Sequence, residues 1–141
     1  MNIKIAENQA EFFGCMLVRA AVFVKEQQVD IDLELDQDDL TCRHFCLMNE
    51  DKQVIGTCRV LAHDDVAHIG RVAILKEYRK QGLGARMLRH VEEECRQIGF
   101  TKMELGAQLH ALPFYEKLGF IPYGEVFMDA SIPHKMMEKV L

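Results

Sequence analysis

The spacing of hydrophobic residues changes along the chain, and each change predicts a different element. Ile3 and Ile5 alternate with polar neighbours, which is typical of a short strand over residues 2–6. From residue 11 to residue 24, apolar side chains such as Phe12 and Val24 recur every three or four positions, which predicts an amphipathic helix. Residues 25–41 are rich in Asp and Glu and have no sustained period, so we expect a loop or a broken helix there.

The middle of the chain has three apolar runs that are typical of strands, at residues 43–48, 54–62 and 67–75. The turn-forming segments 49–51 and 63–65 separate them. Connections this short favour antiparallel pairing of consecutive strands, so we expect a meander.

The second half begins with the clearest helix of the sequence. Apolar residues from Leu83 to Ile98 recur at helical spacing, Arg and Glu occupy the other face, and Gly99 is a stop signal. Beyond it we expect a strand at 102–107, a short helix at 111–118, and two last strands near 120–128 and 134–140.

These elements follow one another in the order β-α-β-β-β-α-β-α-β-β. The predicted fold class is therefore α+β, with a mixed, mostly antiparallel sheet flanked by helices. No repeat, linker or low-complexity tract interrupts the 141 residues, so we expect one domain over residues 1–141.

Composition and charge narrow the class of protein. Seventeen Lys and Arg against 22 Asp and Glu give a net charge of −5, which argues against a nucleic-acid partner and permits a cationic or amine partner. With 49% hydrophobic residues the chain is expected to fold. No apolar run approaches the roughly 20 residues of a membrane span, and the start does not resemble a signal peptide. We therefore expect a cytoplasmic protein without a membrane partner.

The five cysteines also favour a reducing compartment, because they are odd in number and scattered. Cys42, His44 and Cys46 are close enough in sequence to suggest metal ligands. They alternate with Phe45 and Leu47 as residues of a strand do, and no second ligand pair follows at zinc spacing. We therefore predict strand packing here, and no metal site.

The most informative segment, residues 71–86, joins a predicted buried strand to the clearest helix. Backbone N–H groups at a helix start have no intrahelical acceptor and lie at the positive end of the helix dipole. Gly82 and Gly84 remove side chains that would keep an anion from this backbone, and Arg79, Lys80 and Arg86 add positive charge. This basic glycine loop (residues 79–86) predicts a site suited to a pyrophosphate, although its spacing matches neither the Walker pattern nor Gly-x-Gly-x-x-Gly.

The spacing of Arg79, Gly82 and Gly84 resembles the Gln/Arg-x-x-Gly-x-Gly/Ala signature of the GNAT superfamily of N-acetyltransferases. About 30 residues later, a second segment is similar to that family's Asn-x-x-Ala-x-x-x-Tyr-x-x-x-Gly-Phe. The matching residues are Gln108, Ala111, Tyr115, Gly119 and Phe120. The segments 22–29 and 131–134 look like those of the ElaA/YjcF-like branch of small single-domain members, so the resemblance covers nearly the whole chain.

The resemblance implies a GNAT fold with acetyl-CoA as the cofactor and acetyl donor. In this family the pantetheine pairs with the splayed end of the central strand, which corresponds here to Val72, Ala73 and Ile74. Gln108 stands where the family usually has Asn, one methylene longer, and Phe114 and Tyr115 lie in the same motif. The pyrophosphate would bind the signature arginine and the loop that follows it, namely Arg79, Lys80, Gln81, Gly82, Leu83, Gly84 and Ala85.

Acetyl transfer to an amine requires a neutral amine and a proton for the leaving thiolate. Tyr115 is the predicted general acid, because a phenol is protonated near pH 7 and because the residue matches the family position with this role; packing of its ring is the competing interpretation. The strand at 68–72 has no carboxylate, so Glu26 is the predicted base. His68, His110, His134 and an ordered water remain alternatives.

The acceptor is expected to be an amine, on a small molecule or on a protein. The acidic segment 30–39 either attracts a cationic amine or is a solvated loop, and the sequence favours neither. An acyl-CoA-binding sensor without turnover and a pure interaction domain are the alternative functions. A homodimer is also open, since GNAT domains often pair.

Overall fold

Seven strands form one mixed sheet in the computed structural model, which describes residues 1–141. Their spatial order is β1-β2-β3-β4-β5-β7-β6, and β4 and β5 are the parallel pair. The strands are β1 (Asn2–Ile5), β2 (Arg43–Met48), β3 (Val54–His63), β4 (Val66–Ile74), β5 (Lys102–Gln108), β6 (Ile121–Asp129) and β7 (Ile132–Val140). The predicted fold class and order of elements are confirmed.

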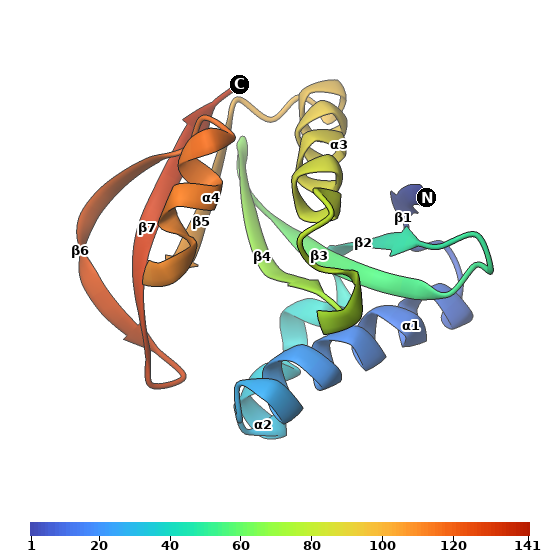
Figure 1. Ribbon diagram of the computed structural model, residues 1–141. Helices are drawn as coiled ribbons and strands as arrows, with labels where there is room; N and C mark the ends of the chain where they lie inside the picture. The colour runs from blue at the N-terminus through green and yellow to red at the C-terminus, as the bar shows by residue number, and fades with distance from the viewer.

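Four α-helices connect and cover the strands (Figure 1). They are α1 (Gln9–Arg19), α2 (Ile31–Glu34), α3 (Leu83–Ile98) and α4 (Leu112–Lys117). The helix expected up to residue 24 continues beyond α1 as a π-helix, Ala20–Glu26. Residues 25–41 form a broken helix, which is one of the two forms expected for them. They contain α2 and the short 3-10 helix Gln37–Leu40, with irregular backbone between them.

Two apolar layers hold the sheet between helices. The larger layer contains 20 buried residues from the sheet, α3 and α4, with Phe45, Met87 and Met137 fully enclosed. The smaller layer, of seven buried residues, lies under α1 on the opposite face and includes Cys15 and Cys46. The N-terminus of α1 is fixed by Asn8, whose side chain accepts a hydrogen bond from the Glu11 amide at 2.8 Å. No helix combines the length and the apolar character that crossing a membrane would require.

The pairing of β4 with β5 is short, and this opens the sheet. Val66–Ile69 pair with Lys102–Leu105, and beyond these residues the two strands diverge (Figure 1). The divergence begins at a β-bulge: Arg59 pairs with Gly70 and Thr57 with Ala73, so β4 has one residue more than β3. Arg71, inside the bulge, has a φ of 53°. Bulges bend a strand and increase its twist, so this one turns the second half of β4 away from β5.

Candidate active site

A cavity of about 920 Å³ occupies the opening between β4 and β5. Its walls come from both strands, the π-helix and the segment after it, the start of α3, α4, and the β6–β7 hairpin. Most residues that the sequence predicts for the site line it: Val72, Ala73, Ile74, Arg79, Lys80, Gly82, Leu83, Gly84, Ala85, Gln108, Phe114 and Tyr115. Gln81 and Glu26 do not line it. A smaller hollow of about 620 Å³ beside β1 and α1 contains none of these residues.

The basic glycine loop presents a row of unused backbone donors. The N–H groups of residues 80–85 have no hydrogen-bond acceptor in the chain, and the first bond of α3 runs from the Arg86 amide to the Gly82 carbonyl at 3.1 Å. No side chain caps this helix. Gly82 has a φ of 76°, in the left-handed region that glycine tolerates best. Six free donors at the positive end of a 16-residue helix make a site for an anion.

Gly84 and Phe114 define how closely the loop is packed. A Cβ atom built at Gly84 would lie 3.4 Å from Cζ of Phe114 and 3.8 Å from a side-chain carbon of Ile74. The bare backbone of Gly84 therefore lies against the apolar wall of the cavity, and a larger residue there would fill the space beside the free amides.

Arg79 and Glu26 are bound to each other across the mouth of the cavity. The guanidinium donates to both carboxylate oxygens of Glu26, at 3.0 and 2.7 Å, and its Nε donates to the Ile74 carbonyl at 2.8 Å. The predicted base is thus engaged by the predicted phosphate ligand. The pair ties the end of the π-helix to the end of β4.

Tyr115 lies on α4 with 8% of its surface exposed, between the rings of Phe114 and Phe120. Its hydroxyl makes no hydrogen bond within the chain, and the residue lines the cavity. Burial raises the pKa of this phenol above its ordinary value, and the negative charge of a Cys58 thiolate would add to the effect. The hydroxyl therefore keeps its proton throughout the physiological range.

A chain of polar side chains crosses the cavity at Gln108. Its amide donates to the Gln27 side-chain oxygen at 2.9 Å, and its own oxygen lies 2.8 Å from Nε2 of His110. Because that oxygen can only accept, His110 is the donor. Gln27 follows the π-helix directly, so the π-helix and the end of β5 are joined across the opening.

His134 on β7 is the most enclosed histidine of the cavity wall, with 8% of its surface exposed. Its Nδ1 lies 2.7 Å from the Ile132 carbonyl, and its ring stacks on Phe127 with the centroids 5.7 Å apart. A carbonyl oxygen only accepts, so Nδ1 carries a proton. In the neutral ring Nε2 then has a free lone pair.

The acidic segment is bound to arginines. Arg19, 1% exposed, donates to Glu34 at 2.8 Å and to both oxygens of Asp39 at 2.7 and 3.0 Å. Arg59 contacts Asp39 at 2.8 Å and both oxygens of Asp36 at 2.6 and 2.9 Å. The negative charges of Glu34, Asp36 and Asp39 are therefore balanced by arginines of the same chain.

The pKa values in this network move in opposite directions. Burial alone would raise the pKa of Asp39, but hydrogen bonds from Arg19, from the Asp36 backbone and from Arg59 outweigh burial and hold that pKa well below its ordinary value. At Glu34 burial prevails and raises the pKa despite the hydrogen bond from Arg19. Glu34 lines the cavity, and Arg71 covers it from β4 with a 3.0 Å ion pair.

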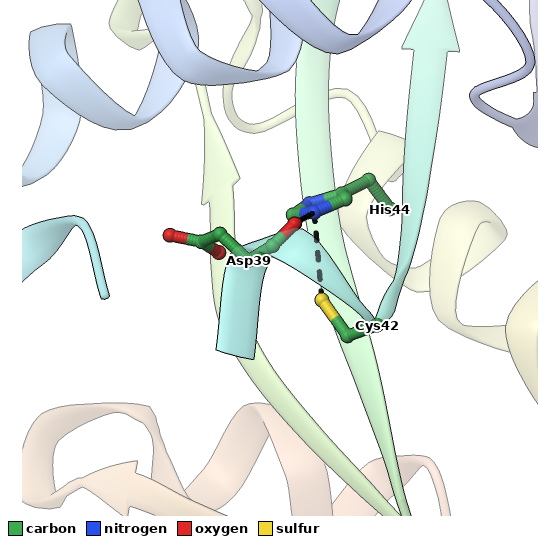
Figure 2. A group of neighbouring side chains, drawn as sticks. All are labelled: Asp39, Cys42 and His44. Carbon is green, nitrogen blue, oxygen red and sulfur yellow. Dashed lines mark hydrogen bonds between the residues drawn. The ribbon is translucent and has the colours of Figure 1, made fainter. Parts of the chain in front are cut away.

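Asp39, Cys42 and His44 lie close together, but the carboxylate points away from the other two side chains (Figure 2). His44 Nε2 lies 2.9 Å from the Asp39 backbone carbonyl and 3.4 Å from the Cys42 sulfur. Burial raises the pKa of the Cys42 thiol. Cys46 is on the other side of the strand pleat from Phe45, and its thiol donates to the Lys4 carbonyl.

The comparisons with known proteins identify the family. A family model described as an acetyltransferase (GNAT) domain matches residues 7–141. The chain belongs to the GNAT family. This membership makes the protein an acyltransferase, as the two sequence signatures predict.

Comparison with individual proteins shows which members of the GNAT family the chain resembles. The N-acetyltransferase YjcF of Bacillus subtilis, itself uncharacterised, is 34% identical over 140 residues, which is 99% of each chain. The crystal structure of Escherichia coli ElaA has a TM-score of 0.88 and 29% identity, over 99% of both chains. An aminoglycoside 6'-N-acetyltransferase in complex with coenzyme A shares the fold, with a TM-score of 0.78 at 16% identity over 99% of this chain and 97% of the other. The predicted resemblance to ElaA and YjcF is confirmed.

Sequence reasoning missed several residues of the site. Gln27 stands in the polar run 25–28, and because its partner is 81 residues away, no local signal points to it. The apolar run 67–75 predicts Arg71 as part of a regular strand, whereas it forms the bulge and bonds to the backbone carbonyls of Leu33 and Glu34. The change of apolar phase between Ile69 and Val72 is the signal in the sequence that could have revealed the bulge.

Proposed function

We propose that the protein transfers an acetyl group from acetyl-CoA to a primary amine, by direct attack of the amine on the thioester. The observation that carries this proposal is the row of six free backbone donors at the mouth of a cavity that opens between β4 and β5. The CoA complex of the aminoglycoside acetyltransferase of the same fold supports it.

The residues present fit the donor. The free amides of the basic glycine loop and the charge of Lys80 would hold the pyrophosphate. Beyond Ile69 the edge of β4 has no strand partner on the β5 side, so Val72, Ala73 and Ile74 are available to the amide groups of pantetheine. When bound, acetyl-CoA supplies an activated acyl carbon and a thiolate leaving group.

The general acid is Tyr115. Its raised pKa keeps the proton on the hydroxyl, and its hydroxyl has no partner within the chain to compete for that proton. Tyr115 donates this proton to the departing sulfur while the acetyl carbon forms its bond to the amine nitrogen.

The general base is His134 in this proposal. Its protonated Nδ1 is fixed on the Ile132 carbonyl, so Nε2 accepts the proton that the amine loses. Glu26, the base expected from the sequence, is instead assigned to holding Arg79, because both of its oxygens are engaged there. The acceptor in this proposal is a primary amine, on a small molecule or on a protein.

Two measurements test the donor and the turnover separately. Calorimetry with CoA should show saturable binding, and a thiol-release assay with acetyl-CoA and a panel of amines should show turnover. Absence of CoA binding would refute the proposal as a whole. Binding without thiol release on any amine would instead favour the acyl-CoA sensor.

Tyr115→Phe and His134→Ala test the two catalytic assignments. Each should lower kcat by roughly 10²–10⁴-fold with CoA affinity changed far less, because general acid–base catalysis contributes on that scale. Tyr123→Phe is the matched control, since Tyr123 lies on β6 outside the cavity wall. An unchanged kcat in either catalytic variant removes that residue from its role.

A further inference from the structure

We infer that His63, His68 and Glu104 form a zinc-binding site on the sheet, at the rim of the cavity. The three residues come from the adjacent strands β3, β4 and β5, and His68 is paired with Glu104 in the parallel ladder. His63 is the last residue of β3, and its ring lies 5.4 Å from that of His68. Two imidazoles and one carboxylate are a donor set that zinc commonly takes in proteins.

The donor atoms are spaced as zinc ligands are. Nδ1 of His68 lies 3.3 Å from Oε1 of Glu104, Nδ1 of His63 lies 3.7 Å from the same oxygen, and all three donor atoms lie within 4.8 Å of one another. Tetrahedral coordination with bonds of about 2.0–2.1 Å places neighbouring ligand atoms roughly 3.3–3.4 Å apart. The cluster therefore needs only a small movement of the exposed His63 ring to enclose an ion.

Nothing else in the chain competes for these donors. The side chain of Glu104 has no Lys or Arg partner within ion-pair distance, and the two histidines bond to nothing but Glu104. The cluster of Asp39, Cys42 and His44 (Figure 2) is the contrast. Arg19 and Arg59 occupy its carboxylate, and a backbone carbonyl occupies His44 Nε2. Of the two clusters, only that of His63, His68 and Glu104 has donor atoms that are not bound by other groups of the chain.

The site is accessible and leaves a coordination position open. The side chains of His63, His68 and Glu104 are 57%, 28% and 21% exposed, so an ion can enter from solvent. Three protein ligands leave a fourth position for water. The ion would also fasten β4 to β5 within their short pairing, directly before the two strands diverge.

Zinc titration of the metal-free protein tests the site. The experiment uses Cys42→Ser, because Cys42 is the one thiol that is not buried and would otherwise contribute a second ligand site. Calorimetry should show one Zn²⁺ per chain, and the thermal unfolding midpoint should rise with Zn²⁺ but not with Mg²⁺. His63→Ala, His68→Ala and Glu104→Gln should each weaken zinc binding by roughly tenfold or more.

His90→Ala is the matched control, because His90 lies 3.9 Å from Glu94 on α3 as an exposed His–Glu pair without a third ligand. It should bind zinc as the Cys42→Ser parent does. Circular dichroism without metal checks that each variant is folded, and His63→Ala is the variant least able to disturb the core, since its side chain is mostly exposed. No saturable zinc binding, or binding that His63→Ala and Glu104→Gln leave unchanged, would overturn the inference; CoA binding is measured in the same samples and reports independently on the proposed function.

Discussion

The basic glycine loop and the acidic segment 30–39 are both dense in polar groups, but they differ in whether those groups have partners within the chain. In the acidic segment, Glu34, Asp36 and Asp39 are bound by arginines from α1, β3 and β4. In the loop, six consecutive backbone donors are bound by nothing in the chain. Charge density alone therefore does not mark a binding site; the absence of an internal partner does.

The two regions differ because their hydrogen-bond partners would have to come from different parts of the chain. The loop's donors belong to the start of a helix, where no preceding turn can supply acceptors. The carboxylates of the acidic segment are satisfied only after folding brings in arginines 15 to 37 residues away in sequence. A buried ionic network and a set of donors left open for a ligand are thus distinguished by their tertiary contacts.

The largest expected effect comes from opening the acidic network. Arg19→Met should lower the free energy of unfolding by about 3–5 kcal/mol, because it leaves Glu34 and Asp39 buried without their shared cation. Urea denaturation measures this loss. Arg96→Met is the control, since Arg96 is 44% exposed in its pair with Glu92 and should cost less than about 1 kcal/mol. Equal losses in the two variants would show that the network is not a structural unit.

A substitution in the loop should lower both stability and ligand affinity. Gly82→Ala forces a side chain onto a backbone with φ of 76°, which should cost about 1–2 kcal/mol. Because the free amides depend on this conformation, CoA affinity should also fall by roughly tenfold, which calorimetry measures. Gly99→Ala also puts a side chain on a backbone of positive φ, 110°, at the other end of α3. It should lose similar stability and keep its CoA affinity; a matching loss of affinity would contradict the role of the loop.

Acid should weaken the arginine network in a defined window. The pKa of Asp36, lowered chiefly by its hydrogen bond from Arg59, and that of Asp39 are both below the ordinary aspartate value of about 3.9. Their stabilisation is complete above that value and is lost as the pH falls further. Glu34 has the opposite slope, but its raised pKa makes it act above this window.

We therefore expect the thermal midpoint to drop between pH 4 and pH 3. Asp36→Asn should make that drop shallower, by less than about 1 kcal/mol of unfolding free energy because Asp36 is partly exposed. Asp38→Asn, which changes a neighbouring carboxylate that bonds to no other side chain, should leave the pH profile unaltered. An equal change in both variants would assign the acid sensitivity to net charge rather than to the pair.

The smallest stability effect is expected at the ion pair of Glu26 and Arg79, which joins the end of the π-helix to the basic glycine loop. Glu26→Gln weakens one exposed ion pair and should cost less than about 1 kcal/mol. Its kcat should fall less than tenfold if Glu26 only holds Arg79, because a lost general base would cost roughly 10²-fold or more. The thiol-release assay distinguishes the two, and a large fall in kcat would restore Glu26 as the base in place of His134.

The fold could be predicted because its signals are local. Apolar runs bounded by turn-forming segments located β2 and β3, the helical repeat from Leu83 to Ile98 located α3 in full, and Gly99 marked its end. The π-helix could not be predicted, because its apolar residues also fit an ordinary helix and its ending depends on contacts after residue 26.

The basic glycine loop, one part of the candidate site, could be predicted for the same reason, because its glycines and the start of α3 are consecutive in the sequence. The rest of the candidate site could not be assembled from the sequence. Gln27, Arg71 and His134 come from three separate elements; His134 was only one of several alternative bases, and its proton position depends on a backbone carbonyl that the folded hairpin supplies.

The bulge at Arg71 makes β4 a strand with two phases. Ahead of it, the odd-numbered Ala67 and Ile69 pack toward α3, whereas after it the even-numbered Val72 and Ile74 do so and Ala73 turns to α1. One inserted residue thus shifts the alternation by one position, so that apolar side chains on both sides of the bulge face the same layer. Deleting Arg71 would leave Ala67, Ile69, Val72 and Ile74 in plain alternation on one face, but it would also remove the bend that turns the second half of β4 away from β5, and the opening between the two strands with it.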